Sequence, residues 1–163
     1  MKRMTVKSAA LVTGFLAATA PVMAAQSTAN LAVTATVADT CAITATTALA
    51  FATIDGGSVT DESVNGILTV VCTSAKTGVT VDMAGGNNAS GGQRRMSDGG
   101  TAFLPYNIHS DSGHASEVAI DGEIYNGDVS AAVPLLINVY GQIPSGSYTA
   151  GVYTDTILVT LTY

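Results

Sequence analysis

The sequence predicts an all-β sandwich made of two packed sheets. Apolar residues alternate with polar ones in several short runs, which is the period of a half-buried strand. No run beyond residue 24 keeps a helical period, and Gly- and Asn-rich segments typical of turns separate the runs. Charged residues make up only 11% of the chain, and the other polar positions are mainly Thr, Ser and Asn. This composition favours strands and turns.

The first 24 residues have the three-part pattern of a secretory signal peptide. Lys2, Arg3 and Lys7 form a basic start, and the apolar run 9–20 follows. Pro21 then breaks the run, and we expect cleavage after Ala24. An apolar run of about a dozen residues is too short for a membrane anchor, which needs roughly 20. The chain is therefore expected to be exported.

The exported part of the chain is strongly acidic. It keeps only three basic residues, Lys76, Arg94 and Arg95, against all twelve acidic ones. A surface of this charge is unsuited to nucleic acid or to an anionic membrane. No later run is long and apolar enough to span a bilayer, so no stable membrane insertion is expected.

Cys41 and Cys72 are the only cysteines, and exported proteins meet oxidising conditions. We predict a disulfide between them. It would close a loop of roughly 32 residues, worth about 3.7 kcal/mol in the chain-entropy model. The alternative, a two-cysteine metal site, would need further ligands at metal spacing, and none are evident.

Along the chain, the first alternating run spans residues 31–37. Its more apolar face carries Leu31, Val33, Ala35 and Val37. Residues 66–72 are apolar on both faces, as in a strand at the middle of a sandwich. Val79, Val81 and Met83 alternate in the next run.

Two strands are expected in the C-terminal part. Residues 133–140 form one, and Pro134 places it at a sheet edge or at a strand beginning, since proline cannot donate to a ladder. The final run alternates Ile157, Val159, Leu161 and Tyr163 with polar or smaller residues. This alternation gives the four side chains one shared face, which we expect to be the core face.

The glycine-rich stretch 85–100 does not form a phosphate loop. It lacks the Lys-Ser/Thr ending and the following helix that such a loop requires. Two hairpin turns around a short strand are the better interpretation.

His109 and His114 are the only imidazoles in the chain. A small metal site or a His–Asp pair with Asp111 is one interpretation, but no third ligand lies at a fixed spacing and no nucleophile-elbow motif occurs. The other interpretation is a strand that ends at His109 in a polar turn. We expect no catalytic residue, cofactor or metal, and hence no enzyme activity.

Several motifs together resemble the spore coat protein U domain family, which includes the archaic, Csu-type chaperone–usher pilins. The most specific lies at the end of the chain, where residues 140–144 (YGQIP) are followed by residues 151–163 (GVYTDTILVTLTY). Residues 105–111 (PYNIHSD) resemble the family's tyrosine strand and aspartate turn, with His109 at a packing position where an aromatic is usual. Cys41 and Cys72 match its disulfide layout.

The resemblance implies an immunoglobulin-like sandwich that lacks its last strand. Residues 25–40 would be an N-terminal donor-strand extension, and residues 41–163 the pilin sandwich. A periplasmic chaperone would fill the open groove during export, and the next subunit would fill it in the fibre. The residues expected to be donated are Leu31, Val33, Ala35 and Val37. The strand expected to border the groove carries Ile157, Val159, Leu161 and Tyr163, and the chain ends inside it.

The partners so implied are a chaperone, an outer-membrane usher and neighbouring pilins. The chain would pass through the periplasm to a fibre on the cell surface that serves adhesion and biofilm formation. A single domain favours a shaft or minor subunit over a tip adhesin. The alternative within the family is a secreted coat protein on a spore or cell surface. A carbohydrate-binding module is a third possibility, but the chain has no Trp and few other aromatics with which to stack on a sugar.

Overall fold

The computed structural model describes residues 26–55 and 62–163. The chain divides into two compact units, Met1–Ala35 and Thr36–Tyr163, and the expected signal peptide lies outside the described residues. Residues 26–40 contain no strand, and all eight strands follow them. Within the described ranges, no helix has the length and apolarity needed to cross a membrane.

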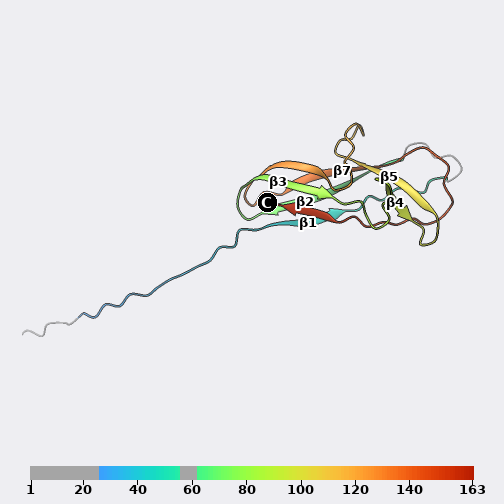
Figure 1. Ribbon diagram of the computed structural model, residues 1–163. Coiled ribbons are helices and arrows are strands. Elements are labelled where there is room, and N and C mark those ends of the chain that lie inside the picture. The colour runs from blue at the N-terminus through green and yellow to red at the C-terminus, as the bar shows by residue number, and fades with distance from the viewer. Residues whose placement is uncertain (1–25, 56–61) are drawn as a thin grey trace, which may run out of the picture. The chain divides into compact units, whose positions relative to one another are not determined.

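The eight strands found in the described residues of the second unit form two sheets (Figure 1). The five-stranded sheet has the order β1-β2-β7-β5-β4. In chain order its strands are β1 (Cys41–Thr47), β2 (Glu62–Cys72), β4 (Arg94–Ser97), β5 (Phe103–His109) and β7 (Leu135–Ile143). Its paired strands are antiparallel. The prediction of an all-β sandwich is confirmed.

The second sheet has three strands in the order β6-β3-β8. They are β3 (Lys76–Met83), β6 (Gly122–Val129) and β8 (Val159–Thr162). Both pairs are antiparallel. The central strand, β3, therefore holds the sheet together, and β8 lies at its edge.

The core lies between the sheets and is built from alternate residues of each strand, as period-two side-chain geometry requires. Val79, Val81 and Met83 of β3 are all buried, which confirms the core face predicted for this run. Further buried side chains come from the five-stranded sheet: Leu68, Val70, Leu104, Tyr106, Ile108, Ile137, Val139 and Ile143.

Two local predictions can be compared with these strands. Pro134 directly precedes β7, so it marks a strand beginning. The edge alternative is wrong, because β7 lies between β2 and β5. The stretch 85–100 contains the short strand β4 between two turns, as predicted.

Candidate functional site: an apolar groove beside the C-terminal strand

Two adjoining cavities, of about 390 Å³ and 430 Å³, open into the side of the sandwich. Both are lined by Leu49, Phe51, Met96 and Tyr153. We call their combined space the apolar groove. Its floor is the core itself, reached at Leu68, Met83, Tyr106 and Val139.

One wall of the groove comes from the N-terminal part of the sandwich domain and the other from its C-terminal part. Residues 46–54, at the end of β1 and in the following segment, form the first wall. Residues 151–159, which lead into β8, form the second. The edge strands β1 and β8 contact each other, and Figure 1 shows β8 (red) beside β1 (cyan). The groove thus follows the open side between an edge strand of each sheet.

The second wall changes sheet along its length. Thr154 exchanges two 2.9 Å backbone hydrogen bonds with Ser97 of β4, in the five-stranded sheet. The backbone N–H of Ala84 then donates a 3.0 Å bond to the carbonyl of Leu158, and Val159 to Thr162 pair with β3 in the other sheet. In the described part of the chain, no strand pairs with the other side of β8. Its outward N–H and C=O groups are available to a further strand.

The four residues predicted to border the groove do not all lie on its inner face. Ile157, Val159 and Leu161 are partly buried and pack against the core, and Ile157 and Val159 line the groove. Tyr163 is 52% exposed and is not among the residues that pack against the core or line the groove. Tyr163 lies beyond the last ladder pair, Thr80–Thr162, and no opposing strand covers it there.

A hydrogen-bond network around Asp155 fixes the groove wall to the core. Tyr106 is buried on the floor, and its hydroxyl donates a 2.7 Å bond to Asp155 Oδ2. The other carboxylate oxygen accepts from the backbone N–H of Asn87 (2.9 Å) and from Asn88 Nδ2 (3.3 Å). Burial, followed by the bond to the Asp155 carboxylate, raises the pKa of Tyr106 well above its usual value.

Gly86 makes room for this carboxylate. Its φ is +85°, and an added Cβ would lie 2.1 Å from Asp155 Oδ2. Both the backbone conformation and the close approach therefore require glycine at this position.

Arg94 is buried near the end of β3 and donates only to backbone carbonyls. Its guanidinium bonds to the oxygens of Ala84 (3.0 Å), Met83 (2.8 Å), Ala119 (2.8 Å) and Val118. Burial lowers its pKa. Arg94 thus joins β4 to the end of β3 and to the segment before β6. Sequence analysis missed this role because an arginine in a Gly- and Asn-rich stretch has the pattern of a solvated turn residue.

The residues expected to be donated are exposed. Leu31, Val33 and Val37 are 87%, 84% and 89% exposed, and Ala35 is exposed as well. Four apolar side chains at alternate positions thus face solvent, and the segment that carries them has no strand partner among the described residues.

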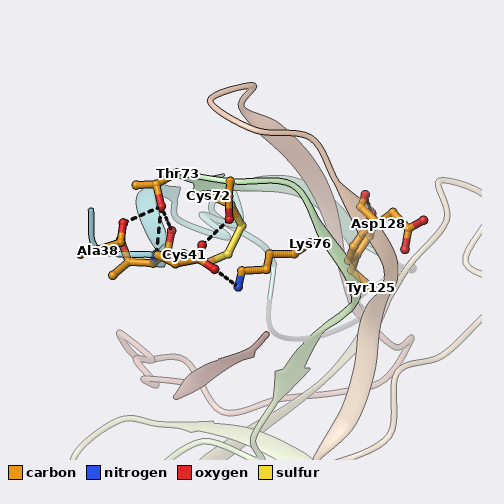
Figure 2. Close-up of a disulfide and its surroundings, with 10 residues drawn as sticks. Ala38, Cys41, Cys72, Thr73, Lys76, Tyr125 and Asp128 are labelled. Carbon is orange, nitrogen blue, oxygen red and sulfur yellow. Dashed lines mark hydrogen bonds and ion pairs between the residues drawn. A yellow bond between two sulfur atoms is a disulfide. The ribbon is translucent and has the colours of Figure 1, made fainter. Parts of the chain in front are cut away.

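The disulfide joins Cys41 to Cys72, as predicted, across the first pair of the β1–β2 ladder. Figure 2 shows the polar contacts of the neighbouring residues 38–40. Thr73 Oγ1 accepts from the backbone N–H of Thr40 (3.0 Å) and donates to the carbonyl of Ala38 (3.2 Å). Lys76 Nζ lies 2.6 Å from Asp39 Oδ2, and Ser74 Oγ donates to the other Asp39 oxygen. The bonds from Lys76 and Ser74 lower the pKa of Asp39.

The two histidines lie together away from the groove. His109 is buried, and its ring meets that of His114 edge-on with a centroid distance of 5.1 Å. The Asp111 carboxylate accepts backbone N–H bonds from Gly113, Ala115 and Ser116, which closes the turn between them. These bonds lower the pKa of Asp111. Within residues 26–55 and 62–163, no three His, Cys, Asp or Glu side chains gather to hold a metal.

Comparison with known families gives a match for most of the chain. The model described as Spore Coat Protein U domain matches residues 27–160. The chain belongs to the spore coat protein U domain family. This confirms the resemblance found in the sequence. The match begins within the exposed N-terminal segment and ends inside β8, so it includes both walls of the apolar groove.

Among solved structures, this spore coat protein U domain is similar to a chain of the CsuC–CsuE chaperone–tip adhesion subunit pre-assembly complex from archaic chaperone–usher Csu pili of Acinetobacter baumannii. The two are 20% identical with a TM-score of 0.46, over 78% of this chain and 40% of that one. The present chain thus spans less than half of its neighbour's length. A search of curated proteins finds no match.

Proposed function

We propose that this spore coat protein U domain is a structural subunit of a chaperone–usher surface pilus. It is assembled by donor-strand exchange and supports adhesion and biofilm formation. A periplasmic chaperone fills the apolar groove during export, an outer-membrane usher passes the subunit outward, and a neighbouring subunit's extension then replaces the chaperone.

The observation that carries the proposal is the groove itself. It lies over the core between two edge strands and is lined mainly by apolar side chains. Beside it, β8 presents backbone groups that no strand of the described chain pairs with. An open edge of this kind promotes uncontrolled association unless a partner strand covers it. An added strand supplies both missing parts, since its backbone extends the ladder and its alternate side chains enter the groove.

The exposed N-terminal segment has the chemistry of such a strand. Leu31, Val33, Ala35 and Val37 lie at alternate positions, so in an extended strand they share one face. Each subunit would give its strand to one neighbour and receive one from another. Such a contact is head-to-tail and propagates as a filament.

The test replaces one donated side chain and one on the opposite face of the same strand. Val33→Asp would place an unpaired charge in a neighbour's groove, which costs several kcal/mol. The matched control, Thr34→Asp, adds the same charge on the face that remains in solvent. We expect both variants to form chaperone-bound subunits, and only Thr34→Asp to polymerise. Polymerisation of Val33→Asp at the wild-type level would refute the proposal.

A secreted coat protein is the alternative within the family. Electron microscopy of cells that express the chain with and without the chaperone and usher separates the two. Fibres that require both partners support the pilus. A surface layer that forms without the usher supports the coat.

A further inference from the structure

Residues 38–40 connect the exposed segment to β1. The exposed segment has two grooves that it could fill, the apolar groove of its own subunit and that of a neighbouring subunit. Since β1 ends in the first wall of the apolar groove, residues 31–37 could in principle turn back beside β1 and fill the groove of their own subunit. Three residues are a common length for a β-hairpin loop. A tethered strand also has an effective concentration of roughly millimolar. Self-insertion would therefore compete strongly with exchange between subunits.

Resting on the proposed function, we propose that the contacts of residues 38–40 form a clamp that opposes self-insertion and so directs the strand to a second copy of the chain. The clamp consists of Ala38, Asp39 and Thr40 on one side and Thr73, Ser74 and Lys76 on the other.

The clamp holds the chain in line with β1. The β1–β2 ladder begins with the pair Cys41–Cys72, and Thr40 and Thr73 continue the same register. The backbone N–H of Thr73 donates to Thr40 O (2.9 Å), while Thr73 Oγ1 binds both Thr40 N and Ala38 O. A hairpin loop over residues 38–40 would have to reverse the chain, and this cannot be done while these bonds persist.

The residue before Thr40, Asp39, makes the charged contact of the clamp, an ion pair with Lys76. Asp39 binds both Ser74 and Lys76. Lys76 Nζ also lies 5.6 Å from the centre of the Tyr163 ring. One cation therefore contacts both the base of the exposed segment and the last residue of the chain.

The chain leaves the domain immediately before the clamp. Val37 is 89% exposed, so the last residue predicted to be donated is outside its own groove. The cavities lie toward the other end of β1, from Thr46 onward. The clamp thus lies at the end of β1 where the chain departs, and the apolar groove lies at its other end, at Thr46 and Thr47.

The test uses the exported chain released from its chaperone. The variant Asp39→Ala/Thr73→Val removes the ion pair and the threonine hydroxyl together. The matched control is Thr77→Val, which alters an exposed threonine one residue past Lys76. A fluorescent peptide with the sequence of residues 26–40 measures the fraction of monomer whose groove is still open.

We expect the double variant to form about three- to tenfold more monomer that does not bind the peptide, at the expense of polymer. This is the range that a few exposed polar contacts can supply. Adding Val33→Asp should restore peptide binding, because the self-inserted strand would then carry a charge. The charge exchange Asp39→Lys/Lys76→Asp should partition closer to the wild type than to the double variant, since it rebuilds the ion pair and keeps the Thr73 contacts.

The experiments distinguish a failure of the clamp proposal from a failure of the proposed function. If wild-type polymers form through residues 31–37 but the double variant partitions as the wild type does, the clamp proposal is wrong and the proposed function stands. If Val33→Asp polymerises normally, the proposed function itself fails.

Discussion

The Tyr106 hydroxyl donates a 2.7 Å hydrogen bond to Asp155 Oδ2, and this bond fastens the segment before β8 to the core. Asp155 lies in the wall of the apolar groove and Tyr106 in its floor. The wall that an incoming strand would meet is therefore held by a buried polar contact as well as by apolar packing. The groove should keep its shape only while this contact is intact.

Replacing Asp155 tests this contact. Asp155→Ala leaves the buried Tyr106 hydroxyl and the backbone N–H of Asn87 without their acceptor. We expect the free energy of unfolding to fall by about 1–3 kcal/mol, the cost of one unsatisfied buried hydroxyl, because Asn87 is exposed and its N–H can bind water instead. Denaturant unfolding of Asp155→Ala, Tyr106→Phe and the double variant measures the coupling. Additive effects of the two substitutions would contradict a direct interaction.

The raised pKa of Tyr106 predicts a loss of stability in alkali. In the unfolded chain this hydroxyl ionises near pH 10, whereas in the folded protein it stays neutral to higher pH. The stabilisation is therefore complete below pH 10 and declines as the pH rises above it. The stability difference between wild type and Tyr106→Phe should shrink by up to about 1.4 kcal/mol per pH unit there. A difference that is constant from pH 9 to 11.5 would contradict the assignment.

Arg94 should be among the most sensitive positions in the domain. Arg94→Met would remove the guanidinium donor from four carbonyl oxygens. Those of Met83 and Ala119 keep a backbone N–H donor, whereas those of Ala84 and Val118 lose the donor that Arg94 gives them, so we expect a loss of about 2–4 kcal/mol. Arg95→Met is the matched control. Arg95 donates one bond to Asn88 O and lies 4.3 Å over the ring of Phe103, so its loss should cost about 1 kcal/mol or less. Thermal unfolding of Arg94→Met and Arg95→Met measures the difference in stability between them. Equal losses of stability would contradict the role given to the Arg94 hydrogen bonds.

The C-terminal strand predicts unequal effects of two truncations. Tyr163 is half-exposed, so its deletion should change stability by less than about 1 kcal/mol. Deleting Leu161, Thr162 and Tyr163 also removes a partly buried side chain and the ladder pairs with Thr80 and Val81. We expect that variant to be degraded in the periplasm and absent from the surface. A soluble, folded monomer without any chaperone would argue against strand exchange.

The sequence predicted those parts of the fold in which local alternation determines burial. The run Val79, Val81 and Met83 shows a period of two, and all three side chains are buried. By contrast, β6 was missed, because its sequence GEIYNGDV contains two glycines, an asparagine and two acids and has the composition of a turn. Only its pairing with β3 makes it a strand.

The site was less accessible to sequence reasoning than the fold. The groove arises where residues 46–54 and 151–159 approach each other, a contact between segments about a hundred residues apart that no local pattern encodes. Arg94 was missed for the same reason, since its carbonyl partners come from two other segments. The alternation of Ile157, Val159 and Leu161 was read correctly, but it could not indicate that pairing ends before Tyr163.

The position of the disulfide has a mechanical consequence for any chain pulled at its N-terminal segment. Tension on residues 26–37 first loads the side-chain contacts of residues 38–40 and then Cys41. Cys41 begins β1, an edge strand that force could peel from β2 one hydrogen bond at a time. Because Cys41 is bonded to Cys72 at the first pair of that ladder, the load passes directly into β2, between β1 and β7 in the sheet. The oxidised domain should therefore bear its load in shear across the sheet, and reduction should convert it to one that unzips at low force.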